Sequence, residues 1–505
     1  MNERSGFTLT VTQEKYLDQG GAEMQALIRV AAAVPGAEPG DGPAAVGAAE
    51  VIIVDCSGSM AIPRPKLLAA RQAAVAALDA MRDGTEFAVL SGRYEATMVY
   101  PRQPTLARAT PQTRAEARAA IKRLDATGGT RISSWLAMAA QLLTPYPGLI
   151  RHAMLFTDGK NQSESQDGTL DRVLSACRGT FTCDARGIGD EWEPSDLLKI
   201  AAVLNGSADG LPDVADLADD FRVVMREAMR KVVPDVALRL RPAPGVTIAG
   251  FRQAYPADAD LTEHGEAADA TAIQYWTGSW SGETRDYIVR LAARADGFRQ
   301  NEDVRLARVD VCARGAGGED PAVLAGPQFV LAHWTPDPPP TTGLFTDGYA
   351  DQRETGSAID AGCRAWLAGQ FGEAEKEWGR AVKLASAEGD DERLSLLAPL
   401  VDMLDPAAGK VRLRDEISRG DVLRAQVRSV TTTFVATGTA AHPGAAPPAS
   451  PAALPPPGPA GRPAQPQACP REGCDRVSPA GARFCEKCGE PLTAAGSEAS
   501  PEADE

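Results

Sequence analysis

The chain has 505 residues, of which 44% are hydrophobic, and it carries a formal net charge of −16. This length predicts two or three domains with apolar cores of their own. The acidic balance, with a pI near 4.9, argues against general nucleic-acid binding, because phosphate groups would be repelled.

No targeting or membrane-spanning segment is expected. Residues 1–5 lack a basic region followed by an apolar stretch, and no window approaches about 18 uncharged apolar residues. Five of the nine cysteines are scattered and four lie together near the end, as in proteins of a reducing compartment. The excess of arginine over lysine, with much alanine, glycine and proline, indicates a GC-rich bacterial genome. We therefore expect a cytoplasmic bacterial protein.

Two strands are expected near the start of the chain. Residues 7–12 alternate between apolar and polar side chains, and residues 26–33 are apolar apart from Arg29. Proline, glycine and acidic residues over 34–47 then predict a loop.

An acid and two hydroxyls follow the next strand directly. Residues 51–54 are all apolar, as in a buried central strand, and they lead into Asp55, Ser57 and Ser59. The three side chains bring oxygen atoms to one short turn, and oxygen ligands suit Mg²⁺ or Mn²⁺ better than Zn²⁺. A D-x-S-x-S string alone occurs by chance, so further residues must support a metal site.

Two further segments supply such residues. Residues 127–130 read Thr-Gly-Gly-Thr, and the glycines let the backbone bring Thr130 close to a ligand. Residues 153–159 form another apolar strand that ends in Thr-Asp-Gly and so places Asp158 at a strand end. If the two acids only capped helices, two acids and three hydroxyls would converge without a purpose.

In order and rough spacing, these three motifs resemble the metal-ion-dependent adhesion site of von Willebrand factor A (VWA) domains. The resemblance covers residues 48–232. It implies a divalent cation, Mg²⁺ or else Mn²⁺ or Ca²⁺, bound by the hydroxyls, with the acids ligating or acting through water. It also implies that an Asp or Glu carboxylate of a protein partner fills the open position of the cation. The implied metal positions are Asp55, Ser57, Ser59, Thr130 and Asp158.

The pattern over 48–232 predicts an α/β fold with a doubly wound, mostly parallel, Rossmann-like sheet, since strands and helices alternate. Ligands of such sheets bind at the carboxyl ends of the strands, where all three motifs fall. Strands are expected near 50–55, 86–91, 95–100, 151–157, 180–186 and 209–212. Helices are expected over 65–82, 111–125, 132–143, 169–177, 194–204 and 214–232.

Residues 233–337 predict short strands separated by turn residues, as in a small antiparallel β-sandwich. Some bacterial VWA proteins look like this, with strands before the VWA domain pairing with strands after it. We therefore assign the strands of 1–47 to the sandwich.

Residues 338–431 predict a helical region. Apolar residues recur at helical spacing over 359–367 and 373–386, and a third helix is expected over 390–403. The first two segments look faintly like one tetratricopeptide unit, but a single unit is too few for a repeat domain. A helical bundle packed on the sandwich is the preferred interpretation.

The C-terminal part has three segments. Residues 432–467 are rich in alanine and proline and predict a linker, and residues 494–505 predict an acidic disordered tail. Between them, residues 468–493 resemble a bacterial zinc ribbon, with a four-residue gap in the first cysteine pair where two is usual. Two disulfides are the main alternative to Zn²⁺, and iron–sulfur ligation is a further one that no motif supports. The implied ligands are Cys469, Cys474, Cys485 and Cys488.

The sequence favours a non-enzymatic scaffold or adaptor that binds a partner carboxylate through its metal site. The resemblance implies multiprotein assemblies, often with AAA+ ATPases or with kinase and phosphatase signalling proteins. A metal-dependent hydrolase or phosphatase is the alternative, but no general acid or base is legible, and Ser57 stands where haloacid-dehalogenase-type phosphotransferases have a second acid. A nucleic-acid-associated factor acting through the ribbon is a third possibility, although the charges of that segment balance.

Overall fold

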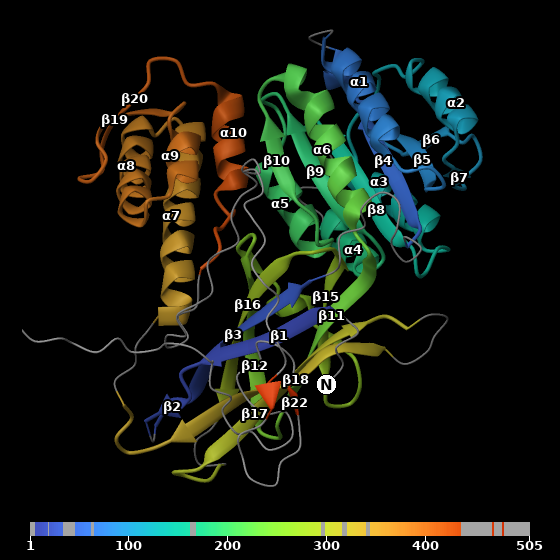
Figure 1. Cartoon of the computed structure of the whole chain (residues 1–505). Coiled ribbons are helices and arrows are strands. Elements are labelled where there is room, and N and C mark those ends of the chain that lie inside the picture. The colour runs from blue at the N-terminus through green and yellow to red at the C-terminus, as the bar shows by residue number, and fades with distance from the viewer. Residues whose placement is uncertain are drawn as a thin grey trace, which may run out of the picture. The chain divides into compact units, whose positions relative to one another are not determined.

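The structure is a computed structural model that describes residues 6–18, 20–33, 46–61, 65–161, 168–293, 298–315, 321–339, 344–435, 467–468 and 477–478. Residues 1–439 form one compact unit and residues 440–505 a second. Within the second unit the structure describes two short antiparallel strands, β21 (Gln467–Ala468) and β22 (Val477–Ser478). The four predicted zinc ligands lie outside the described residues. The first unit has three parts, an α/β domain, a sandwich and a C-terminal helical part (Figure 1).

The α/β domain is built on a seven-stranded sheet with the order β10-β9-β8-β4-β5-β6, in which β7 also pairs with β5. Neighbours from β10 to β5 are parallel, whereas β6 and β7 run antiparallel to β5. The strands are β4 (Ala48–Asp55), β5 (Glu86–Gly92), β6 (Thr97–Tyr100), β7 (Ala107–Arg108), β8 (Ile150–Thr157), β9 (Thr182–Ile188) and β10 (Ala208–Leu211).

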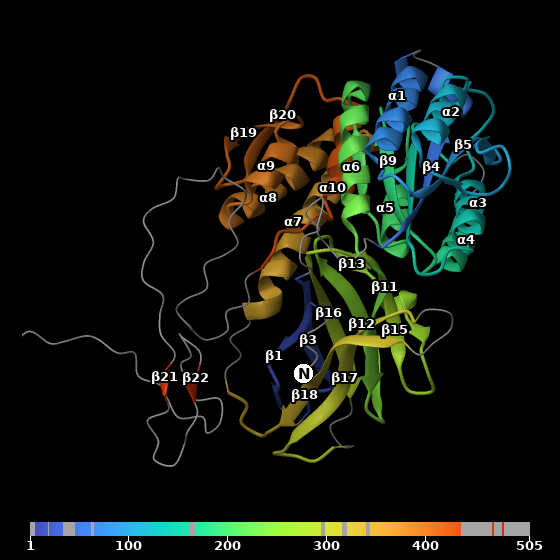
Figure 2. The same cartoon turned by 45° about the vertical axis from the view of Figure 1, so that its right-hand side comes forward.

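Helices cover both faces of this sheet, so every residue of β4 is buried (Figure 2). Ile52 and Val54 pack with α1, α2 and α6 on one face, while Val51 and Ile53 pack with α3, α4 and α5 on the other. The predicted α/β class is thereby confirmed. The helices are α1 (Pro65–Ala80), α2 (Pro111–Ile121), α3 (Ile132–Leu143), α4 (Thr169–Cys177), α5 (Pro194–Val203) and α6 (Leu217–Arg230), with short 3₁₀ turns η1 (Gly58–Ala61) and η2 (Val214–Asp216).

Two further sheets form the sandwich around a common core that includes Phe251, Trp280 and Trp334. One sheet has the order β1-β3-β16-β12-β13 and the other β14-β15-β11-β17-β18-β2. The first strands of the chain, β1 and β3, therefore lie in a sheet with strands from beyond residue 240. The strands are β1 (Phe7–Gln13), β2 (Tyr16–Leu17), β3 (Glu23–Ala32), β11 (Val233–Pro242), β12 (Val246–Tyr255), β13 (Ala259–Asp260), β14 (Glu266–Ala267), β15 (Ile273–Trp280), β16 (Thr284–Ala293), β17 (Asp303–Ala313) and β18 (Ala322–Trp334), with a 3₁₀ turn η3 (Thr262–His264).

The C-terminal helical part contains α7 (Leu344–Leu367), α8 (Phe371–Glu388), α9 (Asp391–Leu397) and α10 (Arg419–Arg428). The prediction of one helix over 390–403 is wrong, because α9 ends at Leu397 and a hairpin of β19 (Val401–Asp405) and β20 (Lys410–Leu413) follows. Pro399 accounts for the stop, since proline has no N–H to donate to the carbonyl of Ser395, four residues before it. None of the helices in the described part of the chain is long and apolar enough to cross a membrane.

The residues after α10 pack on the folded part. Thr431 forms a β-bridge with Ala257, and the Thr432 hydroxyl donates to the carbonyl of Ala254 at 2.6 Å. The folded part therefore extends to at least Val435, past the position at which the linker was expected to begin.

Candidate metal centre

The predicted metal residues meet at one edge of the α/β sheet, where β4 and β8 end. The two strands are parallel neighbours, so Asp55 at the end of β4 lies beside Thr157 at the end of β8, with Asp158 next along the chain. Both carboxylates are fully buried. This edge is where a parallel sheet positions ligands.

Two hydrogen bonds fix Asp55. One carboxylate oxygen accepts from the Ser57 backbone N–H at 2.8 Å, and the other accepts from the Thr157 hydroxyl at 2.6 Å. Burial raises the pKa of Asp55 to about 6, although the hydrogen bonds from Ser57 and Thr157 act in the opposite direction. A bound cation would favour the ionised form of this carboxyl group.

The hydroxyl residues are held close to Asp158. The Ser57 and Ser59 hydroxyls lie 3.0 Å apart, and the Ser59 hydroxyl donates to Asp158 Oδ1 at 2.6 Å. The turn that carries Thr130 is joined to them through its backbone, because Gly58 N–H donates to the carbonyl of Gly128 at 2.8 Å.

Gly159 shows how closely the three hydroxyls converge. A Cβ atom at this residue would lie 3.1 Å from Thr130 Oγ1, 3.2 Å from Ser59 Oγ and 3.9 Å from Ser57 Oγ. Only a glycine keeps this space free, and three hydroxyls with two acids around it fit a hard cation such as Mg²⁺. Among the described residues no group of three or more His, Cys, Asp or Glu side chains could hold a metal, so cation binding here depends on the hydroxyls.

Lys66 also contacts the site, which the sequence analysis did not foresee. Its ammonium lies 3.0 Å from Asp158 Oδ2, and only 8% of its side chain is exposed. Thr157 was likewise missed as a partner of Asp55, although its position before Asp158 at a strand end was a usable signal. No pattern in the sequence connects Lys66 with Asp158, because they are 92 residues apart.

Cys56 is buried beside the site, and burial raises the pKa of its thiol to about 11, which leaves it protonated.

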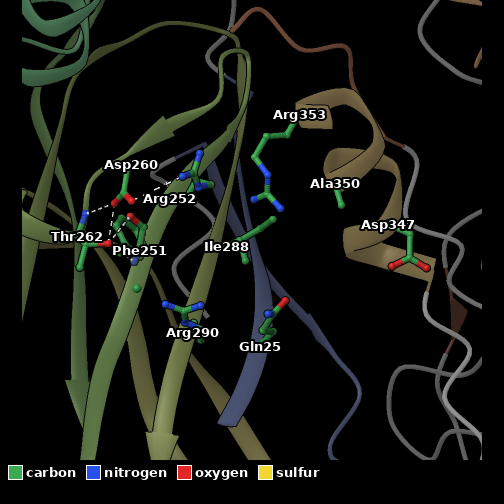
Figure 3. Close-up of a pocket in the computed structure, with 11 residues that line it drawn as sticks. Gln25, Phe251, Arg252, Asp260, Thr262, Ile288, Arg290, Asp347, Ala350 and Arg353 are labelled. Atoms are coloured by element: carbon green, nitrogen blue, oxygen red, sulfur yellow. Dashed lines mark hydrogen bonds and ion pairs between the residues drawn. The ribbon is translucent and has the colours of Figure 1, made fainter. Parts of the chain in front are cut away.

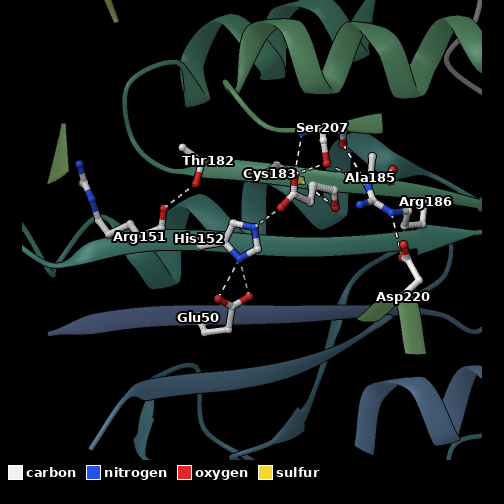
Figure 4. A network of polar contacts seen from close by, with 10 residues as sticks. Glu50, Arg151, His152, Thr182, Cys183, Ala185, Arg186, Ser207 and Asp220 are labelled. Atoms are coloured by element: carbon white, nitrogen blue, oxygen red, sulfur yellow. Dashed lines mark hydrogen bonds and ion pairs between the residues drawn. The ribbon is translucent and has the colours of Figure 1, made fainter. Parts of the chain in front are cut away.

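A second polar cluster lies at the opposite end of the same strands (Figure 4). His152 Nδ1 is 2.8 Å from a carboxylate oxygen of Glu50, and its Nε2 is 2.9 Å from Asp184 Oδ2. Asp184 also accepts from the Ser207 hydroxyl and backbone N–H. Every polar atom of the cluster is directed at another protein group, which indicates a structural role.

The sandwich carries a pocket of about 440 Å³ on the side that faces α7 (Figure 3). Arg252 and Arg290 line it from the sheet, and Arg353 reaches toward it from α7. Arg252 is already paired with Asp258 at 2.6 Å, and Asp260 and Asp347 also line the pocket. The mixed charges select no ligand class.

Comparison with known proteins agrees with the fold. The model of the von Willebrand factor type A domain matches residues 49–209, and that of the von Willebrand factor type A C-terminal domain matches residues 383–429. The second match covers the end of α8 through α10, a part of the chain whose sequence pattern predicts only a helical region.

Two solved structures cover most of the chain. A von Willebrand factor type A structure from Catenulispora acidiphila is 35% identical, covers 86% of this chain and 99% of its own, and has a TM-score of 0.76. The ArnB paralog VWA2 from Sulfolobus acidocaldarius has a TM-score of 0.51 over 84% of this chain and 98% of its own, and at 12% identity it supports the fold alone.

A curated relative matches over a shorter range. An uncharacterized protein of Synechocystis sp. is 26% identical over 259 residues, which is 50% of this chain and 59% of that protein. This chain therefore spans less than two thirds of the length of that relative. The domain matches, and above all the similarity to the Catenulispora protein over nearly its full length, show that the chain belongs to the von Willebrand factor type A family.

Proposed function

We propose that this chain is a non-enzymatic adaptor that binds the carboxylate of a protein partner through a divalent cation. The observation that carries the proposal is the convergence of the Ser57, Ser59 and Thr130 hydroxyls around the space beside Gly159, next to two buried carboxylates. This donor set contains few negative charges. A cation held there would stay electron-poor and would attract a further anionic ligand.

The cation, which we propose to be Mg²⁺ with Mn²⁺ or Ca²⁺ as substitutes, would supply an electrophilic position for the partner. The protein residues orient the donors. Asp55 is held by Ser57 and Thr157, and Asp158 holds the Ser59 hydroxyl, so that few side chains need to reorganise on binding. Among the described residues, Lys66 is the one basic side chain that contacts these carboxylates, and it forms an ion pair with Asp158. A lysine in an ion pair is charged and cannot act as a general base, so the site favours binding over hydrolysis.

The partner is proposed from the resemblance to bacterial VWA proteins. It presents an Asp or Glu side chain and belongs to an assembly with an AAA+ ATPase or with kinase and phosphatase signalling proteins. The net charge of −16 makes a nucleic-acid partner unfavourable.

The cysteines at the end of the chain are proposed to bind one Zn²⁺ as a structural ribbon. Four thiolates within 20 residues suffice for a tetrahedral site that folds a small module. A cytoplasmic location, with its reduced thiols, suits such a site. The ribbon would add a second attachment point for partners.

Gly159→Ala tests the metal site without removing any ligand. Its methyl group would make unusually tight contacts with Thr130 Oγ1 and Ser59 Oγ, so these hydroxyls would have to shift by a few tenths of an ångström, and Mg²⁺ demands near-ideal geometry. We expect Mg²⁺ affinity, measured by calorimetry on the full chain, to fall about tenfold or more. Gly372→Ala in α8 is the matched control, because nothing lies within 4 Å of its Cβ position.

The same variants test the partner. Immobilised wild-type chain should capture proteins from a bacterial lysate in Mg²⁺ but not in EDTA, and Gly159→Ala should lose them while Gly372→Ala keeps them. Changing the acid of a captured partner to its amide should reproduce the loss, because the amide is a poorer ligand for a hard cation. Equal capture in Mg²⁺ and EDTA would overturn the mechanism.

A further inference from the structure

Lys66 occupies the side of Asp158 that faces away from Ser59. Its ammonium is 3.0 Å from Asp158 Oδ2, while Asp158 Oδ1 accepts from the Ser59 hydroxyl at 2.6 Å. Both oxygens of this fully buried carboxylate are therefore engaged by protein groups. The Lys66 side chain is only 8% exposed, so water screens the ion pair weakly.

A cation bound among the hydroxyls would meet the charge of Lys66. Asp158 is one of the metal positions that the sequence motif implies, and Lys66 neutralises the same carboxylate. Like charges in a buried site repel strongly because the effective dielectric constant is low. The ammonium and the divalent cation therefore compete for the charge of Asp158.

A pocket with acidic residues beside Lys66 could accept its ammonium group if a cation displaced it from Asp158. Lys66 also lines an open pocket of about 790 Å³, and Asp190, Glu191 and Asp213 line the same pocket. Gly189 lines the same pocket, as does Arg419, and a Cβ atom at Gly189 would lie 3.7 Å from the Lys66 nitrogen. The absence of a side chain there leaves room for Lys66 to move toward these acids.

We propose that Lys66 is a built-in counter-ion that weakens cation binding, so that the metal is held firmly only when a partner carboxylate adds negative charge. This proposal rests on the proposed function of the site. It makes binding of metal and partner mutually dependent, since a partner that raises metal affinity must itself bind more tightly in the presence of metal.

Titration of Mn²⁺ alone into the full chain tests the proposal. Lys66→Met removes the competing charge, and we expect it to bind Mn²⁺ about tenfold more tightly than the wild type. Lys66→Arg retains the charge and should not tighten binding. Lys199→Met is the matched control, because Lys199 is an exposed lysine of α5 that pairs with Asp171.

Thermal melting gives a second readout. Without metal, Lys66→Met leaves Asp158 without its ion pair and should melt below the wild type, and Mn²⁺ should then raise its melting temperature by more than it raises that of the wild type. Lys66→Gln, which can still donate to Asp158, serves if the methionine variant does not fold. If the wild type binds Mn²⁺ and both neutral variants bind it equally or more weakly, the proposed role of Lys66 is wrong. The proposed metal site would not be contradicted by that result. Absence of Mn²⁺ binding in wild type and variants alike would overturn both proposals.

Discussion

His152 lies between two carboxylates at the amino ends of the sheet strands. Burial lowers the pKa of an isolated imidazolium, but the charges of Glu50 and Asp184 and their hydrogen bonds raise the pKa of His152 to about 10. In the unfolded chain the pKa of histidine is about 6.5. The folded protein therefore holds a proton at this residue that the unfolded chain releases near neutral pH.

This difference predicts a pH dependence of stability. The contribution of His152 is fully present below pH of about 6.5 and is lost as pH rises toward 10, by up to about 1.4 kcal/mol per pH unit. Urea unfolding of the full chain at pH 7, 8 and 9 should show this decline. His152→Gln should be less stable at pH 7 and should lack this part of the slope. A variant with the same slope as the wild type would show that the imidazole is neutral in the fold.

The convergence of the candidate metal residues was predictable from sequence for a physical reason. Motifs at the ends of parallel strands must meet at one edge, and Asp55 and Asp158 each follow an apolar run that could only be a central strand. The partners of His152 were not predictable. They depend on the register of the sheet. Glu50 of β4 lies opposite His152 of β8, and Asp184 lies two residues after the β9 residue that is opposite His152.

Among the elements, β3 lies inside a sandwich sheet, as expected for a strand of residues 1–47. It pairs with β1 on one side and β16 on the other, and its Leu27 and Ile28 are fully buried. Arg29 on β3 forms a bidentate ion pair with Asp286 of β16, at 2.6 and 2.8 Å, and Tyr349 of α7 donates to the same carboxylate. The first strands of the chain therefore share the core of the sandwich with residues beyond 240.

Deleting residues 1–33 should destabilise the sandwich. The loss of β3 leaves an edge of β16 unpaired and removes the buried side chains of β3 from the core, at a cost of several kcal/mol if each buried large side chain contributes about 1.5–3 kcal/mol. We expect a lower melting temperature and concentration-dependent aggregation, measured by calorimetry and light scattering. A chain of residues 6–505 keeps β1 and β3 and is the control. Melting of the 34–505 chain at the wild-type temperature would contradict this account.

The sequence misplaced the start of α7, which begins well before the expected residue 359, and it missed a short hairpin that lacks a distinct period. In the hairpin of β19 and β20, Val401, Met403 and Val411 alternate with polar residues, but a run of five residues fits a helix or a strand equally well. The helices between the sheet strands were easier, and α3 and α4 begin and end where the pattern predicted. Proline gave the missing signal at position 399.

On the scale of residues 1–439, ion pairs tie the three folded parts together. Arg151 of β8 pairs with Asp235 of the sandwich at 2.6 Å, and both side chains are largely buried. Arg428 of α10 pairs with Asp209 of β10 at 3.0 Å. The sequence could not show these contacts, because each joins residues far apart along the chain whose charges look like ordinary surface charges. The α/β domain, which contains the candidate metal centre, is thus held by ion pairs to both the sandwich and the C-terminal helical part.

Residues 440–505 form a separate unit, and this predicts that zinc and stability of the main unit are independent. Elemental mass spectrometry of purified full-length protein should find about one zinc per chain, bound by four thiolates. The double variant Cys485→Ser and Cys488→Ser should lose that zinc, while the urea midpoint of the main unit stays unchanged.

Gly159→Ala is the matched control for this measurement. It alters a site of hard oxygen donors, which suit Mg²⁺, and leaves the four thiolates that suit Zn²⁺ untouched, so it should keep its zinc. Conversely, the cysteine variant should keep its Mg²⁺ affinity. Full zinc content in the double cysteine variant would disprove the ribbon assignment. If Gly159→Ala lost zinc instead, the zinc would be bound at the VWA site, because this substitution changes that site and none of the cysteines.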